Sequence, residues 1–153
     1  MDYKEVQGLA KDTMEYARKA VRAGMTLMEV RELCEKKLLE LGADSFWYWD
    51  IGAFVFAGDE TAVSVSGPRY QTSGRIIQEN DIITIDLSPQ CGDIWGDYAR
   101  TFIVENGIVV DGEACSNEEW KQGIAMEKEL HRKMRSFVTP DTTFEELYEY
   151  MNQ

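Results

Sequence analysis

One segment, residues 80–107 (NDIITIDLSPQCGDIWGDYARTFIVENG), constrains the fold of this chain more than any other. Over 81–88, isoleucine and leucine alternate with polar residues, which is typical of a strand with one buried face. Further strands are expected at 97–104 and 107–110. The segment therefore predicts an antiparallel β-hairpin with one face in a hydrophobic core.

Two acidic residues of this hairpin stand out. Alternation places Asp86 on the face away from the apolar side chains. A turn near Cys91 and Gly92 would place Asp86 directly opposite Asp97, although Pro89 suggests a loop wider than two residues. Opposed side chains lie roughly 5 Å apart, where two carboxylates need a shared proton or a bound cation. The pair predicts a divalent-metal site, and the alternative is a slipped register with both acids in water.

The rest of the chain alternates between helical and strand-like patterns. Capping-box pairs, in which a Thr or Ser is followed three residues later by Glu, mark three helix starts at Thr26, Ser116 and Thr143. The expected helices are 4–23, 26–42, 116–137 and 143–153, and the expected additional strands are 46–57 and a short one at 62–65. These elements predict an α+β fold with a helix pair, an antiparallel β-sheet with a hairpin, and the start of a second helix pair.

Composition limits the possible partners and setting. The length of 153 residues fits a single domain, 1–153, and a net charge of −12 argues against nucleic acid and anionic membranes. Three cysteines at wide spacing imply no disulfide framework, so we expect a cytoplasmic protein. The first residues carry charges and no apolar stretch, so no signal peptide is expected, and no apolar run approaches a membrane span.

Two other features have competing explanations. The aromatic run at 46–49 (FWYW) either lines a substrate pocket or packs in the core. His131, the only histidine, lies in a charged helical stretch without ligand-like neighbours, and is interpreted as a surface or interface residue.

The hairpin resembles the metal-binding hairpin of the pita-bread metallopeptidases, which include methionine aminopeptidases, Xaa-Pro aminopeptidases, prolidases and creatinases. In both, a strand ends in a hydrophobic residue and Asp, and Asp-x-x-Arg-Thr-Phe follows a short loop. Here Asp86 and Asp97 stand eleven positions apart, and residues 97–102 read DYARTF. The resemblance extends over most of the chain and implies an incomplete pita-bread fold.

The resemblance also implies roles for individual residues. Asp86 would bridge or chelate one metal ion and Asp97 would bridge two, with Arg100 and Thr101 as supports behind these ligands. The implied ions are Mn²⁺, Co²⁺, Fe²⁺ or Zn²⁺. The implied reaction is metal-dependent hydrolysis of a peptide at its N-terminal residue or at an Xaa-Pro bond.

The chain departs from the family pattern in two ways. The family has five protein ligands, and its His and two Glu ligands would follow Gln153. The histidine that the family carries in the loop before the hairpin is absent from 62–67. We therefore predict no catalytic residue on this chain, an inactive part of a dinuclear peptidase, weak or absent metal binding, and homodimers formed through an open sheet edge. The alternative is a non-catalytic peptide- or protein-binding module with the same fold.

Overall fold

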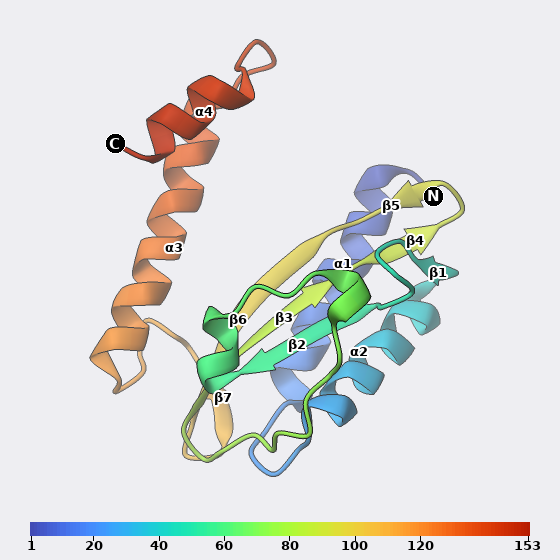
Figure 1. Cartoon of the computed structure of the whole chain (residues 1–153), viewed down its shortest axis with the longest axis vertical. Coiled ribbons are helices and arrows are strands. Elements are labelled where there is room, and N and C mark those ends of the chain that lie inside the picture. Colours follow the sequence, from blue (N-terminus) through green and yellow to red (C-terminus); the bar gives the residue numbers. More distant parts are fainter. The chain divides into compact units, whose positions relative to one another are not determined.

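The computed structural model describes all residues, 1–153, and divides into two compact units. The first unit, Met1–Asp111, holds two helices and both β-sheets. The second unit, Gly112–Gln153, holds the last two helices. None of the helices combines the length and apolar character needed to cross a bilayer. The predicted α+β fold, with a helix pair followed by antiparallel sheet, is confirmed (Figure 1).

The helices and strands alternate along the chain as the sequence predicts, with some different bounds. The helices are α1 (Tyr3–Ala20), α2 (Leu27–Leu41), α3 (Glu118–Phe137) and α4 (Phe144–Met151). The strands are β1 (Ser45–Phe46), β2 (Ala53–Ala57), β3 (Asp81–Leu87), β4 (Pro89–Cys91), β5 (Ile94–Trp95), β6 (Tyr98–Glu105) and β7 (Ile108–Val110).

The predicted helix starts are correct at two positions and shifted at a third. The Thr26 and Thr143 capping boxes are present, each with the Glu three residues later. The cap of α3 is Asn117 rather than Ser116, and its side chain accepts a hydrogen bond from the Trp120 N–H. The first helix ends at Ala20, three residues before the predicted end, because the chain turns extended there to form a bridge with β7.

The predicted strand at 46–57 is wrong in its middle. Only its two ends form strands, β1 and β2, because Trp49 and Asp50 adopt left-handed backbone conformations with φ of 58° and 55°. The Trp49 ring lies against Gly67, where a Cβ would meet it at 2.2 Å. The short strand predicted at 62–65 is also wrong, because a 3₁₀ helix, η1 (Gly58–Ala62), occupies the start of this region.

The hairpin runs through two sheets. Strands β3 and β6 form the centre of a sheet ordered β2-β3-β6-β7, and their continuations β4 and β5 belong to a second sheet ordered β1-β4-β5. The crossing falls at Ser88 on one strand and at Gly96 and Asp97 on the other, which lie outside all strands. All pairings are antiparallel.

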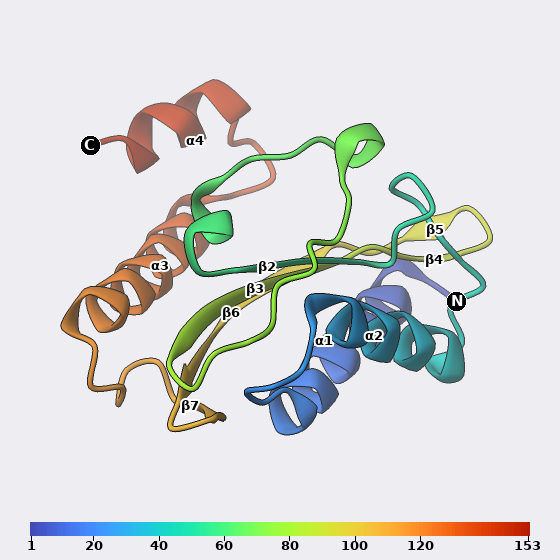
Figure 2. The same cartoon turned by 60° about the horizontal axis from the view of Figure 1, so that its bottom comes forward.

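The two faces of the larger sheet differ. Helices α1 and α2 cover one face, where Ile83, Ile85 and Leu87 are fully buried, as alternation predicts (Figure 2). The first part of the chain between β2 and β3 runs over the opposite face, and its second part returns to the helix side, where Ile76 forms a bridge with Thr26. Asp86 belongs to this second face, so the sheet separates the acidic side chain from the main core.

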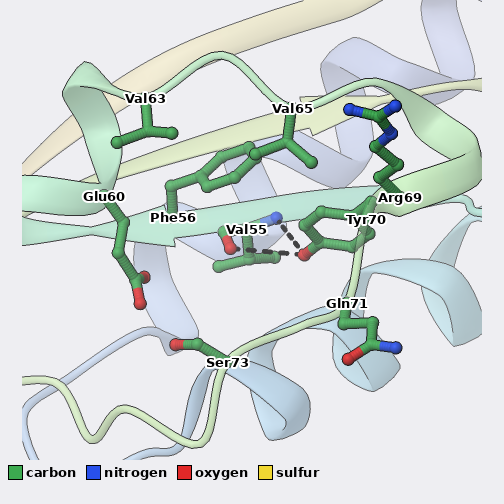
Figure 3. Close-up of a pocket in the computed structure, with 9 residues that line it drawn as sticks. All are labelled: Val55, Phe56, Glu60, Val63, Val65, Arg69, Tyr70, Gln71 and Ser73. Carbon is green, nitrogen blue, oxygen red and sulfur yellow. Dashed lines mark hydrogen bonds between the residues drawn. The ribbon is translucent and has the colours of Figure 1, made fainter.

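A tyrosine side chain closes the outer edge of β2. The Tyr70 hydroxyl accepts a hydrogen bond from the Val55 N–H at 2.8 Å and donates to the Val55 carbonyl at 3.2 Å (Figure 3). Further along this edge, the Glu60 carboxylate accepts from the Ala57 N–H at 3.3 Å. These side chains form hydrogen bonds with main-chain groups of β2 that an added strand would need for pairing.

Replacement of Tyr70 by Phe tests this closure. The variant leaves the buried Val55 N–H and carbonyl without their partner, so we expect the free energy of unfolding in urea to fall by about 1–3 kcal/mol. Tyr16→Phe is the matched control, because Tyr16 is exposed on α1. Equal stability of the two variants would show that the hydroxyl does not hold the edge.

Candidate metal centre

The register of the hairpin differs from the prediction by two residues. Asp86 pairs directly with Ala99, not with Asp97. The turn lies one residue later than predicted, because Cys91 pairs with Ile94 and only two residues connect them. Gly92, the first of these two, has a φ of 58°, a conformation that glycine adopts without strain.

The two aspartates are nevertheless close. A shift of two residues leaves every side chain on the same face, so the face that carries Asp86 is the predicted one. Continued through the crossing, the register places Asp97 across from Ser88, one diagonal step from Asp86. The structure thus brings the two acids close enough for the charge of Asp97 to disfavour the charge of Asp86.

The surroundings of Asp86 disfavour its charge. Its direct cross-strand neighbours are Phe54 on β2 and Ala99 on β6, neither of which offers a polar side chain. Burial, followed by the charge of Asp97 and the hydrogen bond to it, raises the pKa of Asp86 to about 6. At neutral pH, a cation between the two carboxylates would remove the repulsion that this pKa reports.

Asp86 lines a cavity of about 390 Å³ on the sheet face opposite the helix pair. Its walls come from β2, β3 and β6 and from the chain that follows β2. The lining residues are Tyr48, Phe54, Phe56, Thr61, Ala62, Val63, Ser64, Val65, Thr84, Asp86 and Ala99. The aromatic run 46–49 was expected either to line a pocket or to pack in the core. Tyr48 lines the cavity, whereas Phe46 packs against the main core.

A second, smaller cavity of about 220 Å³ lies beside the first. The two share Phe56, Val63 and Val65 as walls, and Tyr70 closes the smaller one against β2 (Figure 3). The side chain of Phe56 stands between the two valines and Tyr70 in the close-up view. The two cavities are therefore separated by an apolar wall formed by Phe56, Val63 and Val65.

The two supporting residues named from the resemblance lie on different faces. Thr101 pairs with Thr84, and their hydroxyl oxygens are 3.4 Å apart on the Asp86 face. Arg100 pairs with the buried Ile85, and its guanidinium lies 4.0 Å from the Tyr98 ring centroid while donating to the Ala99 carbonyl. Its contacts are thus away from the carboxylates, and the supporting role of both residues stays a prediction.

Two side chains that sequence reasoning missed hold the main chain at Asp97. Gln7 of α1 exchanges two hydrogen bonds with the Asp97 peptide groups, and the Trp47 indole N–H donates to the Gly96 carbonyl at 2.7 Å. Gln7 stands 90 residues before Asp97, and no sequence pattern connects them.

Two carboxylates suit a hard divalent cation, which prefers oxygen ligands. No group of three or more His, Cys, Asp or Glu side chains is arranged to hold an ion. His131 lies on α3 of the second unit, in a groove with Lys128, Arg132 and Arg135, which is a cationic setting unlike that of a metal ligand. Asp86 and Asp97 thus fit a metal ion as two members of a ligand set.

Comparison with known proteins identifies the family. The sequence profile of metallopeptidase family M24 matches residues 2–153. The chain belongs to this family. Its members as a class use divalent metal ions, which agrees with the carboxylate pair. No curated protein matches the M24 chain in a sequence comparison.

Solved structures show the same fold. The M24 chain superposes on a prolidase from Pyrococcus furiosus with a TM-score of 0.79 at 19% identity, over 97% of this chain and 40% of that one. The Pseudomonas aeruginosa aminopeptidase PepP gives a TM-score of 0.78 at 17% identity, over 97% of this chain and 30% of that one. An X-Pro aminopeptidase from Thermotoga maritima gives a TM-score of 0.70 at 19% identity, over 87% of this chain and 33% of that one. The chain therefore spans about a third of the length of these structures and has part of the pita-bread fold, as predicted.

The raised pKa of Asp86 predicts a pH-dependent stability. The folded chain retains this proton up to about pH 6, whereas the unfolded chain loses it near its ordinary value of 3.8. The group's contribution to the free energy of unfolding therefore falls as pH rises from about 4 to about 6, and stays low above that.

Asp86→Asn tests this dependence, because an amide has no proton to lose in this range. We expect the variant to gain stability relative to wild type between pH 4 and pH 7, measured by urea unfolding at each pH. Asp93→Asn, at the exposed hairpin turn, is the control. A constant difference between Asp86→Asn and wild type over this range would contradict the raised pKa.

Proposed function

We propose that this chain forms part of a dinuclear metal-dependent peptidase, with Asp86 and Asp97 as two of the metal ligands. The observation that carries the proposal is the diagonal placement of the two acids across the hairpin, with Asp86 at the wall of a mostly apolar cavity. Like charges in such surroundings are unfavourable unless a cation or a proton lies between them. A divalent ion bound there would lower the pKa of a water molecule and make it a nucleophile.

The substrate class follows from the family and from the cavity. Several solved relatives are described as prolidases or Xaa-Pro peptidases, which favours a peptide with proline in second position over other substrates of the superfamily. The walls formed by Tyr48, Phe54 and Phe56 suit the apolar part of such a peptide. Asp86 would then hold the ion beside the bond to be cleaved.

Further expectations remain part of the proposal. The chain alone is expected to be inactive and to bind metal weakly, since two carboxylates supply only part of a ligand set. A single domain 1–153, a cytoplasmic location and a homodimer are likewise proposed. The free thiols of Cys34, Cys91 and Cys115 agree with a reducing compartment. If the dimer forms through a sheet edge, the closure of β2 by Tyr70 argues for an edge other than that of β2.

The second candidate is a non-catalytic peptide-binding module. The cavity favours it, because most of its walls consist of apolar and aromatic side chains that can contact a peptide without any ion. The two functions differ in whether peptide binding requires the carboxylate pair.

Metal titration tests the assigned ligands. With Mn²⁺ or Co²⁺ monitored by calorimetry, we expect Asp97→Asn to weaken binding at least tenfold, because loss of even an outer partner of a ligand costs roughly 10- to 100-fold. Asp93→Asn removes the same charge from the same hairpin and should bind as wild type. Equal affinities for Asp97→Asn and wild type would refute the assignment.

Titration with an Xaa-Pro dipeptide separates the two functions. The peptidase proposal predicts that dipeptide binding strengthens in the presence of Mn²⁺ and that Asp97→Asn abolishes this effect. The binding-module alternative predicts equal affinity with and without Mn²⁺, and an affinity that Asp97→Asn leaves unchanged. Isothermal titration calorimetry with the dipeptide, in the presence and absence of Mn²⁺, measures both affinities.

A further inference from the structure

The main chain of Asp97 lacks the partner that a β-ladder would give it. Asp97 lies between β5 and β6, and the residue across from it is Ser88. The Ser88 N–H donates to the Gly52 carbonyl at 3.1 Å, and the Ser88 carbonyl accepts from the Trp47 N–H at 3.2 Å. Both main-chain groups of Ser88 therefore bond to the segment before β2, and those of Asp97 need another partner.

The side-chain amide of Gln7 is that partner. Its Nε2 donates to the Asp97 carbonyl at 2.6 Å, and its Oε1 accepts from the Asp97 N–H at 2.9 Å. A primary amide can donate and accept at once, so it satisfies both peptide groups as a neighbouring strand would. Gln7 itself stands on α1 beside Val6, which is fully buried in the protein interior.

The residue before Asp97 is fitted to the same helix. A Cβ at Gly96 would lie 3.0 Å from the Gln7 Oε1 and 3.3 Å from the Val6 carbonyl oxygen. The absence of a side chain at Gly96 thus lets the hairpin approach α1 closely enough for Gln7 to reach Asp97. The indole N–H of Trp47 also donates to the Gly96 carbonyl, at 2.7 Å.

This support matters because the Asp86 carboxylate repels the Asp97 carboxylate. Asp86 and Asp97 occupy diagonal positions of the hairpin, where two ionised carboxylates repel each other and tend to separate. Asp86 lies inside β3, where ladder bonds to both neighbouring strands fix its main chain. Asp97 has no such bonds, and its position depends on whatever else holds its backbone.

We propose that Gln7 is a positioning residue that holds Asp97 against Asp86 and thereby arranges the two metal ligands. This role depends on the proposed function, because Asp97 acts as a ligand only there. Gln7 contacts neither carboxylate and acts through the Asp97 peptide groups. Helix α1, which lies on the opposite side of the sheet from the cavity, thus contributes to the geometry of the site.

Gln7→Ala tests the proposal, because alanine favours the helix and removes the amide that bonds to Asp97. In ¹⁵N-labelled protein, we expect the Asp97 amide to exchange with solvent roughly tenfold faster than in wild type, and Mn²⁺ to bind roughly tenfold more weakly. Gln122→Ala, an exposed glutamine on α3, is the matched control and should match wild type in both measurements.

A metal-free measurement distinguishes failure of this role from failure of the proposed function. In wild type, Asp97→Asn should change the ¹³C carboxyl shift of Asp86 at pH 8, and in the Gln7→Ala background this change should fall by at least half. The carboxyl shifts need no metal ion, so they decide the role of Gln7 whether or not Mn²⁺ binds to the pair in wild type. Unaltered Asp97 exchange, or an undiminished shift change in the Gln7→Ala background, would overturn the proposal.

Discussion

The diagonal placement of Asp86 and Asp97 across the hairpin is the constraint around which the hairpin is organised. Two carboxylates that repel each other stay together because the opposite face of the same strands is anchored in the core. Ile83, Ile85 and Leu87 are fully buried, and a slip of one residue would expose them and bury the acids. The hydrophobic energy of the core thus determines the face on which the acids lie. The ladder and the Gln7 amide determine how close they come.

The sequence predicts this face correctly but not the register. Alternation around Asp86 has a period of two, so an error of two positions in the turn does not change which side chains share a face. The error arose from placing the turn at Cys91 and Gly92, one residue too early. The wider loop suggested by Pro89 is also wrong, because Pro89 lies within β4 and its carbonyl accepts from the Gly96 N–H. The family pattern, which depends on spacing in sequence, was insensitive to this error.

Contacts between distant segments were beyond sequence reasoning. The run at 46–57 has the composition of one strand, but its middle turns because Trp49 packs against Gly67, a residue of the following segment. The Gln7 amide is one polar side chain on an amphipathic helix and has no local signal. Phe54 and Phe56 are different, because alternation within β2 places both on the Asp86 face, and this pattern was available in the sequence.

The same desolvation that raises the pKa of Asp86 also affects how strongly the pair binds a cation. Below about pH 6 a proton occupies the site and reduces the repulsion, so a metal ion must displace it. The buried Phe54 beside Asp86 reduces the screening of the Asp86 charge by water, which strengthens the binding of a proton or a divalent ion to this carboxylate. The metal carries two charges and can contact both carboxylates at once, whereas the proton belongs to one oxygen. The advantage of the metal therefore depends on Asp97 staying in place, and this is why the backbone support of Asp97 affects the chemistry of a site that it does not touch.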